Sequence, residues 1–225
     1  MNIYRHLIIG VVMLVIVGVF FWFLPQVDLW ASRCFFEPRY FILLPREWAI
    51  QTRFLLDYLV WATIATAIVG VVTSFWWKRR PKWLTTRACI YVFLSFAIAP
   101  GLVANVILKN NWGRPRPAQT IDFGGDKEYQ QIWVISDECP TNCSFVCGEC
   151  AGAFTFVCFV PLCRRKKTVL AAVAIFAALV GTVRLGQGGH FLSDVLSAYL
   201  VDYVVIVALY GLIYHSGRSS GVRAI

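Results

Sequence analysis

Charged residues are scarce in this chain. Only 15% of its 225 residues are charged and 59% are hydrophobic, whereas soluble domains average about 25% charged and about 45–50% apolar residues. This composition excludes an ordinary soluble domain and predicts a protein with several membrane-spanning segments. Histidine occurs three times and acidic residues twelve times, so few side chains are available for acid–base chemistry.

Features of nucleic-acid recognition are also lacking, although the formal net charge is +9. Lys and Arg cluster in short connections between apolar runs, which is typical of topology signals and of contact with anionic lipids. The chain has no aromatic-basic platform, internal repeat or low-complexity tract, and no convincing cleavage site follows its first apolar run. We therefore predict one membrane domain, residues 1–225, with no nucleic-acid partner and no obligate protein partner.

Apolar runs predict an all-α fold, a polytopic bundle of six transmembrane helices. The runs cover residues 7–24, 54–77, 88–108, 149–163, 169–185 and 191–214. The fourth run is short for a bilayer, and Pro100-Gly101 predicts a kink in the third. Asp202 in the last run is expected to serve helix packing, and Asp57 in the second is expected to pair with Arg53, one turn earlier.

The distribution of basic residues predicts the orientation. Six spans put both termini on one side, where residues 1–6 and 215–225 form tails and the second tail is disordered. That side collects the basic runs 78–87 and 164–167 and no acidic residue, so it is predicted to be the cytoplasm of a bacterium. Three segments then face the periplasmic side of the inner membrane: the 26–53 connection, the 109–148 loop and the 184–190 turn.

The segment 181–194 holds the polar residues around which the chain is organised. Arg184, His190 and Asp194 are its ionisable residues, and such groups at membrane depth are costly, which favours a functional role. If the chain is helical from residue 191, His190 and Asp194 lie one turn apart and the carboxylate can orient the imidazole as a base or nucleophile. Arg184 adds a planar fork suited to phosphate oxygens. The alternative is an interfacial loop whose Arg and Asp merely pair.

The third apolar run ends in a basic, proline-rich segment, residues 109–117. Its alternating prolines hold Arg114 and Arg116 in an extended arrangement that follows Lys109. A compact ammonium charge together with bidentate guanidinium groups suits a bound phosphate. The alternative is a snorkelling lysine with interfacial arginines that anchor the helix.

A third polar segment, residues 142–152, leads into the fourth run. Gly148 and the backbone N–H groups of a helix start can form a cradle for an anion. Glu149 is either an ordinary first-turn acid or, if burial keeps it protonated, an acid catalyst.

Four cysteines, at positions 139, 143, 147 and 150, have a spacing that suggests a metal site. Zinc and iron–sulfur ligands favour other patterns, and the loop is predicted to face an oxidising compartment. A disulfide between Cys139 and Cys143, or one that uses Cys34, is therefore favoured, and we expect no metal and no cofactor. Cys147 can be a nucleophile only beside a partner that lowers its thiol pKa, so His190 is favoured.

Together these segments resemble the type 2 phosphatidic acid phosphatase family. That family's motifs are Lys-x6-Arg-Pro, Pro-Ser-Gly-His and Ser-Arg-x5-His-x3-Asp; the first and third correspond here to Lys109-x6-Arg116-Pro117 and Arg184-x5-His190-x3-Asp194. The resemblance implies that Lys109, Arg116 and Arg184 hold a phosphate. It further implies that His190 attacks phosphorus to form a phosphohistidine, while Asp194 orients the ring. The positions of the other two histidines agree with this role. His6 and His215 fall at the cytoplasmic edge, so His190 alone can serve a site on the outer side.

The second motif departs from the family pattern. It reads Val146-Cys147-Gly148-Glu149, so Cys147 replaces serine and Glu149 replaces the histidine that protonates the leaving group in the family. Val183 also stands where the family has serine. Cys147 and Gly148 are thus candidate phosphate-binding positions and Glu149 a candidate acid, and a specialised or an inactive enzyme are both open.

The sequence therefore predicts metal-independent hydrolysis of a phosphate monoester or diphosphate on a membrane lipid, at the periplasmic membrane interface. The segment 143–149 looks like the lipid A phosphatase branch of the family, with undecaprenyl diphosphate and phosphatidylglycerol phosphate as rival substrates. The alternatives are a lipid phosphotransferase, an anionic-lipid transporter without hydrolysis and a structural membrane subunit.

Overall fold

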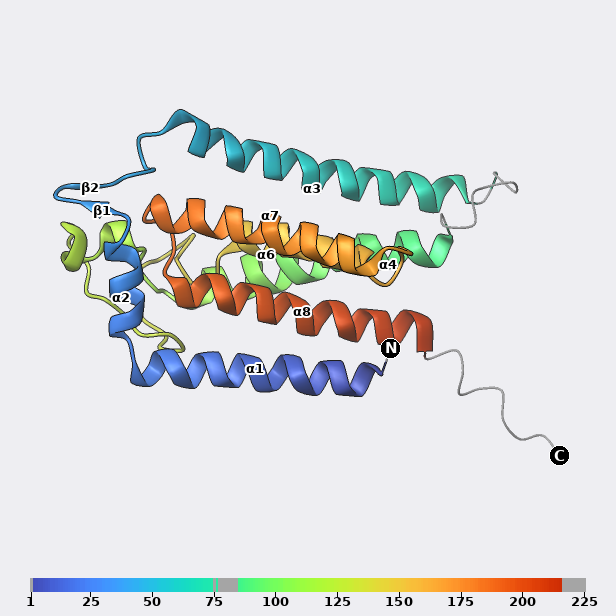
Figure 1. Ribbon diagram of the computed structural model, residues 1–225, viewed down its shortest axis with the longest axis horizontal. Coiled ribbons are helices and arrows are strands. Elements are labelled where there is room, and N and C mark those ends of the chain that lie inside the picture. The colour runs from blue at the N-terminus through green and yellow to red at the C-terminus, as the bar shows by residue number, and fades with distance from the viewer. Residues whose placement is uncertain (1, 75, 77–84, 216–225) are drawn as a thin grey trace.

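Long helices dominate the computed structural model, which describes residues 2–74, 76 and 85–215. Within these residues, five helices are long and apolar enough to cross a membrane: α1 (Ile3–Phe23), α3 (Glu47–Thr73), the continuous helix Thr86–Asn111, α7 (Lys166–Gly186) and α8 (Leu192–His215). Their long axes are aligned (Figure 1), with α1 packed on α8 and α3 on α4, the first part of the third helix. The predicted all-α bundle is confirmed.

Apolar side chains face outward along these helices. In the most apolar stretch of α1 only 17% of the residues are buried inside the protein, and the same share is buried in α3. Val15, Ile16, Phe54 and Trp61 are among the exposed side chains. Such a surface is stable against lipid tails and far too apolar for water. The chain is therefore a multi-pass membrane protein.

The third long helix changes its geometry near Pro100. It consists of α4 (Thr86–Phe96), the π-helical segment η1 (Ala97–Leu108) and one last turn, α5 (Lys109–Asn111). Proline lacks an N–H and crowds the preceding turn, while the side-chain amide of Asn105 donates to the Pro100 carbonyl at 2.7 Å. The helix changes to π-helical hydrogen bonding around Pro100-Gly101 and continues past it to Lys109, and the kink predicted there stays a prediction.

The predicted fourth span is shorter than the others. The segment consists of the eight residues of α6 (Gly148–Thr155) and the four of the 3-10 turn η4 (Phe156–Phe159). Twelve residues extend about 18 Å, less than the roughly 30 Å of bilayer hydrocarbon. α6 packs among η1, α7 and α8, where Thr155 donates to Asp202 at 2.7 Å, so Asp202 joins two helices as predicted. The sixth crossing stays a prediction.

The connecting segments gather at one end of the bundle (Figure 1). They are α2 (Gln26–Arg33), the hairpin of β1 (Phe36–Glu37) and β2 (Tyr40–Phe41), and the 3-10 turns η2 (Pro117–Gln119) and η3 (Ile121–Phe123). The loop before α6 contains a Cys139–Cys143 disulfide, one of the two pairings predicted. At the opposite end α1 begins at Ile3, so most of the predicted tail 1–6 is helical. The predicted disorder of the second tail falls almost entirely outside the described residues.

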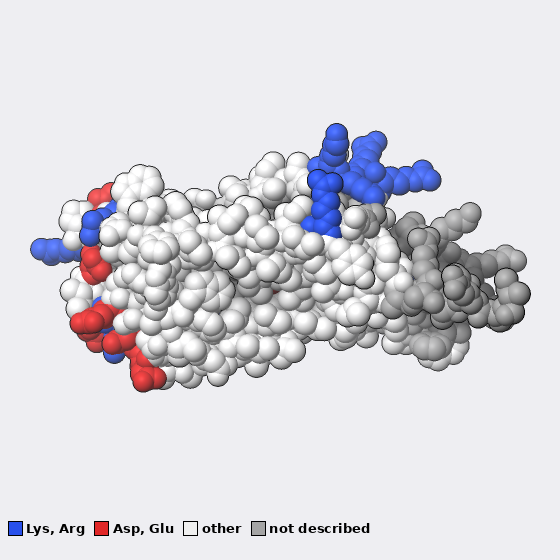
Figure 2. Space-filling model, turned by 90° about the horizontal axis from the view of Figure 1, so that it is seen from below, with Lys and Arg blue, Asp and Glu red and all other residues white. Residues whose placement is uncertain are grey.

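Charged side chains gather toward the two ends of the molecule. On the face shown in Figure 2, acidic side chains with some Lys and Arg lie at the end that carries the connecting segments, and a group of Lys and Arg side chains lies toward the other end. The surface between them is largely uncharged. An uncharged belt between two charged ends is what a membrane protein presents to the hydrocarbon core.

Candidate active site

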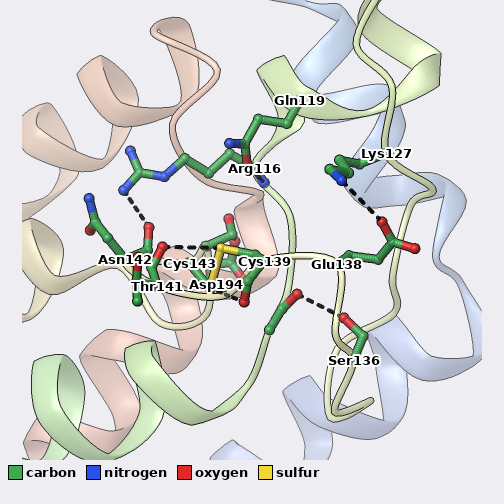
Figure 3. The surroundings of a disulfide bond; sticks show 12 residues. Arg116, Gln119, Lys127, Ser136, Glu138, Cys139, Thr141, Asn142, Cys143 and Asp194 are labelled. Atoms are coloured by element: carbon green, nitrogen blue, oxygen red, sulfur yellow. Dashed lines mark hydrogen bonds and ion pairs between the residues drawn. A yellow bond between two sulfur atoms is a disulfide. The ribbon is translucent and has the colours of Figure 1, made fainter.

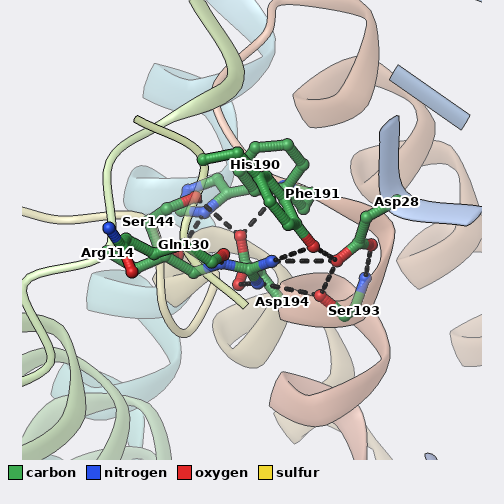
Figure 4. Close-up of polar contacts among 9 residues, drawn as sticks. Asp28, Arg114, Gln130, Ser144, His190, Phe191, Ser193 and Asp194 are labelled. Carbon is green, nitrogen blue, oxygen red and sulfur yellow. Dashed lines mark hydrogen bonds and ion pairs between the residues drawn. The ribbon is translucent and has the colours of Figure 1, made fainter. Parts of the chain in front are cut away.

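The imidazole of His190 is oriented by the backbone of Ser144 (Figure 4). His190 lies in the turn between α7 and α8, is fully buried, and its Nδ1 atom is 2.6 Å from the Ser144 carbonyl oxygen. Because a carbonyl oxygen only accepts, Nδ1 carries a proton, and in the neutral ring the free lone pair is on Nε2. Among the described residues Nε2 finds no hydrogen-bond partner. This nitrogen is thus buried, oriented and free to react.

Asp194 acts on this histidine through Ser144. One of its carboxylate oxygens, Oδ2, accepts hydrogen bonds from the Ser144 hydroxyl at 2.6 Å and from the Phe191 N–H at 2.9 Å, and the other pairs with Arg114. The direct contact expected between Asp194 and the imidazole is therefore replaced by a link through the residue that holds Nδ1. The sequence-based argument missed Ser144 because its carbonyl, a group that every residue has, makes the contact.

Arg114 lies at the centre of a buried network of ion pairs (Figure 4). Its guanidinium group is fully buried, lies 2.9 Å from the Asp28 carboxylate and pairs with Asp194. It also donates to the Ser193 hydroxyl at 2.8 Å, and Asp28 accepts from the Ser193 N–H at 2.8 Å. Arg114 therefore joins the loop to α2 and α8, and its charge is satisfied by two carboxylates. These contacts favour a structural role for Arg114 over the phosphate contact that the sequence left open.

A second cluster of charges surrounds the carboxylate of Glu149. Its Oε1 atom lies 3.2 Å from Nη2 of Arg53 and 3.5 Å from Nη2 of Arg184. Its Oε2 atom lies 3.8 Å from Nζ of Lys109 and 3.6 Å from Nε2 of His190. Three basic side chains thus converge beside Nε2 of His190, an arrangement suited to binding a phosphoryl group.

The structure places the other predicted phosphate-binding residues differently. Arg116 donates from Nη2 to the Asn142 carbonyl at 2.8 Å, on the loop that contains the disulfide (Figure 3). Gly148 packs against Asn105, and a Cβ atom at this glycine would lie 2.2 Å from the Asn105 side-chain oxygen. Lys109 and Arg184 therefore reach Glu149 directly, Arg116 lies at the rim, and Gly148 allows close packing.

Arg53 is a residue of this cluster that sequence reasoning assigned elsewhere. It was expected to pair with Asp57 on its own helix, but its guanidinium group reaches Glu149 on α6. Helical spacing pointed to a local partner, whereas the contact that forms depends on how α3 packs beside α6.

Two glycines shape the turn that carries His190. Gly188 has a positive φ of 63°, and a Cβ atom there would lie 2.3 Å from the Phe41 ring. At Gly189 a Cβ atom would lie 2.6 Å from Nη2 of Arg184. The Arg184 side chain folds over this turn, where its Nη1 atom donates to the side chain of Gln187. The turn thus positions the base and the cation together.

Cys147 borders the same cluster. It is the N-cap of α6 and its Sγ atom accepts from the Cys150 N–H at 3.3 Å. Donor atoms of Cys147, Glu149 and His190 all lie within 4.8 Å of one another, and these are groups that bind zinc in proteins. The three basic side chains around Glu149 nevertheless favour an anion over a divalent cation at this point.

Neighbouring charges shift the pKa values of His190 and Cys147. Burial lowers the pKa of His190, but Cys147 and Glu149 beside it outweigh burial and raise that pKa above its ordinary value. Burial likewise raises the pKa of the Cys147 thiol, but the hydrogen bond with Cys150 and the charge of His190 bring this pKa well below its usual range. The thiol and the imidazole therefore titrate as a pair, in which each charged form stabilises the other.

A cavity of about 490 Å³ adjoins Glu149. Arg53, Lys109, Asp57 and Glu149 line its polar part, while Trp61 and Phe96 line its apolar part between α3 and the third long helix. An anionic headgroup with an apolar chain matches this division of the cavity.

Comparison with known proteins bears on this geometry. The model of the PAP2 superfamily matches residues 87–218, more than half of the chain. The chain belongs to the PAP2 superfamily. The resemblance predicted from the three polar segments is confirmed. Asp28 and Arg53, which complete the two charge clusters of this PAP2 protein, lie outside the matched residues.

Three curated relatives of this PAP2 protein are named lipid A 4'-phosphatase. The protein from Francisella tularensis subsp. novicida strain U112 is 41% identical over 133 residues, which cover 57% of this chain and 59% of that protein. Those from Rhizobium leguminosarum and Rhizobium etli are 43% and 44% identical over 121 residues, covering 52% of this chain and 52% and 47% of their own. This chain spans about half the length of the curated relatives it matches. No solved structure gave a significant match.

Proposed function

We propose that this PAP2 protein is a membrane lipid phosphatase that transfers a phosphoryl group from a lipid to His190 and then to water. One observation carries the proposal: Arg53, Lys109 and Arg184 converge on a single carboxylate whose Oε2 atom lies 3.6 Å from His190 Nε2. A phosphate that entered this cluster would meet the same positive charges within reach of an oriented nucleophile.

In the first step, Nε2 of His190 forms a bond to phosphorus and the bond from phosphorus to the lipid oxygen breaks. The basic side chains stabilise the charge on the remaining phosphate oxygens. Glu149 gives a proton to the leaving oxygen. In the empty site these cations favour the ionised carboxylate, and a bound phosphate competes for them, so substrate binding itself favours the protonated acid.

In the second step, Glu149 acts as a base. Its carboxylate takes a proton from a water molecule whose oxygen attacks phosphorus, and the bond between phosphorus and Nε2 breaks. Inorganic phosphate leaves, and both His190 and Glu149 return to their starting states. Because every proton is moved by these residues and water, the reaction as proposed requires no metal ion.

The substrate that we favour is a phosphate group of lipid A in the outer leaflet of a bacterial inner membrane. The curated relatives carry that substrate in their names, and the cavity beside Glu149 joins basic side chains to an apolar wall. The end with the connecting segments then faces the periplasm. This orientation puts the described basic residues near the start of α7, Arg165 to Lys167, in the cytoplasm.

The test is phosphate release by the purified full chain in detergent. Lipid A, undecaprenyl diphosphate, phosphatidylglycerol phosphate and phosphatidic acid are supplied in turn, with EDTA present and with vanadate as inhibitor. We expect release from lipid A, a loss of at least about 10³-fold in His190→Ala, and acid-labile phosphate on the wild-type protein. His215→Ala, at the exposed far end of α8, is the matched control and keeps full activity.

Equal release by His190→Ala and wild type would refute the phosphohistidine route. Tight binding of these lipids without any phosphate release would instead indicate a transporter, and transfer to a second lipid would indicate a phosphotransferase.

A further inference from the structure

Two thiols lie closer than van der Waals contact at the start of α6. The Sγ atoms of Cys147 and Cys150 are 2.6 Å apart, and both residues are fully buried. A disulfide bond is about 2.05 Å long, so the sulfurs need to approach by only about half an ångström. Their Cys-x2-Cys spacing at a helix N-terminus is that of dithiols that exchange readily, because the helix dipole favours the thiolate.

We propose that Cys147 and Cys150 are a site of disulfide formation and that this modification frees His190 to act as the nucleophile. The second half of the proposal rests on the phosphatase function proposed above. The first half rests on the positions of the two sulfurs and on the periplasmic orientation proposed above.

The link to the nucleophile is the position of the Cys147 sulfur. Sγ of Cys147, a carboxylate oxygen of Glu149 and a ring nitrogen of His190 lie within 4.8 Å of one another, and Nδ1 is already engaged by Ser144. In the dithiol form a Cys147 thiolate therefore favours a proton on Nε2 of His190, which removes the lone pair that attacks phosphorus. A disulfide sulfur is uncharged and cannot take up a proton, so oxidation leaves Nε2 deprotonated more of the time.

The oxidant is a second disulfide, either of a small molecule or of an exchange protein. The Cys147 thiolate attacks one of its sulfurs to form a mixed disulfide, and the first thiol is released. The Cys150 thiolate then attacks Cys147 Sγ and releases the second thiol. Two cysteine thiols become one disulfide, and the oxidant is reduced to two thiols.

Access and compartment both agree with this chemistry. Gly148 and Glu149, which lie between the two cysteines, form part of the wall of the 490 Å³ cavity. The Cys139–Cys143 disulfide lies in the same connecting loop, and the Cys143 N–H donates to the Lys109 carbonyl at 3.3 Å. A bonded pair and the candidate pair therefore lie at the same end of the protein, which faces the periplasm in the proposed orientation.

Peptide mapping tests the modification without reference to activity. The full chain is purified in detergent without reductant, treated with dipyridyl disulfide, unfolded in N-ethylmaleimide and digested. In this oxidised sample we expect Cys147 and Cys150 in one unalkylated, disulfide-bonded peptide. In a second sample, reduced before alkylation, both cysteines carry the alkyl group. Cys158, buried in η4, is the internal control and is alkylated in both samples. Alkylation of Cys147 and Cys150 in the oxidised sample would overturn the proposed disulfide.

Phosphate release tests the control of His190. The measurement uses a Cys139→Ser, Cys143→Ser background, so that only the second pair responds to reductant. We expect a phosphine reductant to lower release by at least about tenfold, and dipyridyl disulfide to restore it. Adding Cys147→Ser together with Cys150→Ser removes the response to both reagents, whereas adding Cys158→Ser preserves it.

The outcomes separate the two proposals. Equal release by the oxidised and reduced proteins, with the disulfide mapped, would end the proposed control and leave the phosphatase standing. A mapped disulfide in a protein that releases no phosphate in either state would sink the proposed function, and with it the control of His190, and leave only the modification site.

Discussion

The Nδ1 atom of His190 lies 2.6 Å from the carbonyl oxygen of Ser144, a residue 46 positions earlier in the chain. The Ser144 N–H donates to the Arg114 carbonyl at 2.8 Å and its hydroxyl to Asp194 at 2.6 Å. One serine thus connects the orientation of the imidazole to the buried ion pairs. The position of the imidazole depends on a network that reaches α2.

Two arginines separated by one proline should respond differently to substitution. Arg114→Met leaves Asp28 and Asp194 as buried charges without a partner, so we expect a loss of about 3–5 kcal/mol of stability. Thermal unfolding in detergent measures this loss. Arg116 lies at the rim of the site. Arg116→Met should therefore lower phosphate release, while the unfolding temperature stays within about 2 °C of wild type. Equal destabilisation by both variants would contradict this division.

Ser144→Ala should lower activity although the substituted residue keeps its carbonyl group. The variant loses the hydrogen bond to Asp194, so the loop that orients His190 is held less firmly, and we expect about a tenfold lower kcat with little change in KM. A double-mutant cycle with Asp194→Asn checks the link. If Asp194 acts through Ser144, the double variant loses less activity than the product of the two single-variant losses. Fully multiplicative losses would show that the two residues act independently.

Glu149→Gln should bind phosphate analogues more tightly than wild type. In the empty site the carboxylate pairs with Arg53, Lys109 and Arg184, and the neutral amide leaves these charges to the incoming anion. We expect vanadate to inhibit at about tenfold lower concentration, as one removed competing charge is worth about 1–2 kcal/mol here. Lipid turnover falls in the same variant because the acid is lost. Weaker vanadate binding would show that the carboxylate does not compete with the anion.

The pH dependence of the reaction should follow His190. Attack requires the neutral imidazole, and in the dithiol protein Cys147 and Glu149 raise the pKa of His190 above its ordinary value. With a reductant present, the rate should therefore rise with pH through a midpoint above about 6.5. Glu149→Gln removes one of the groups that raise this pKa, so its midpoint shifts to lower pH.

An aryl phosphate is the suitable substrate for this measurement, because its leaving group departs without an acid and both enzymes turn it over. Glu138→Gln, a substitution at a partner of Lys127 on the connecting loop, is the matched control and keeps the wild-type midpoint. A midpoint that stays the same in Glu149→Gln would argue against this electrostatic coupling.

Parts of the site were predictable from local pattern. The motif Lys109-x6-Arg116 and the spacing of Arg184, His190 and Asp194 identified the family, and Lys109, Arg184 and His190 do lie together around Glu149. These residues sit at helix ends or in a tight turn, where spacing along the chain already restricts direction. The spans were predictable for the same reason, since length and hydropathy are local properties.

Contacts between distant segments were not predictable in this way. Spacing alone paired Arg53 with Asp57 and left Arg114 open between phosphate binding and helix anchoring, yet the partners of these arginines lie on α6, α2 and α8. Asp28 was not singled out among the residues of the 26–53 connection, because its partner Ser193 lies 165 positions away in the chain. No periodicity relates such positions, because only the packing of the helices brings them together.

The sequence by itself determined that this protein is a helical membrane protein and that three polar segments carry one imidazole and several cations, since composition, span length and motif spacing are read along the chain. Only the tertiary structure decided which cation meets which carboxylate, that Ser144 rather than Asp194 holds the imidazole, and that two thiols meet beside it. The reason is physical: a buried charge pairs with the opposite charge that packing places nearest, at whatever distance along the chain.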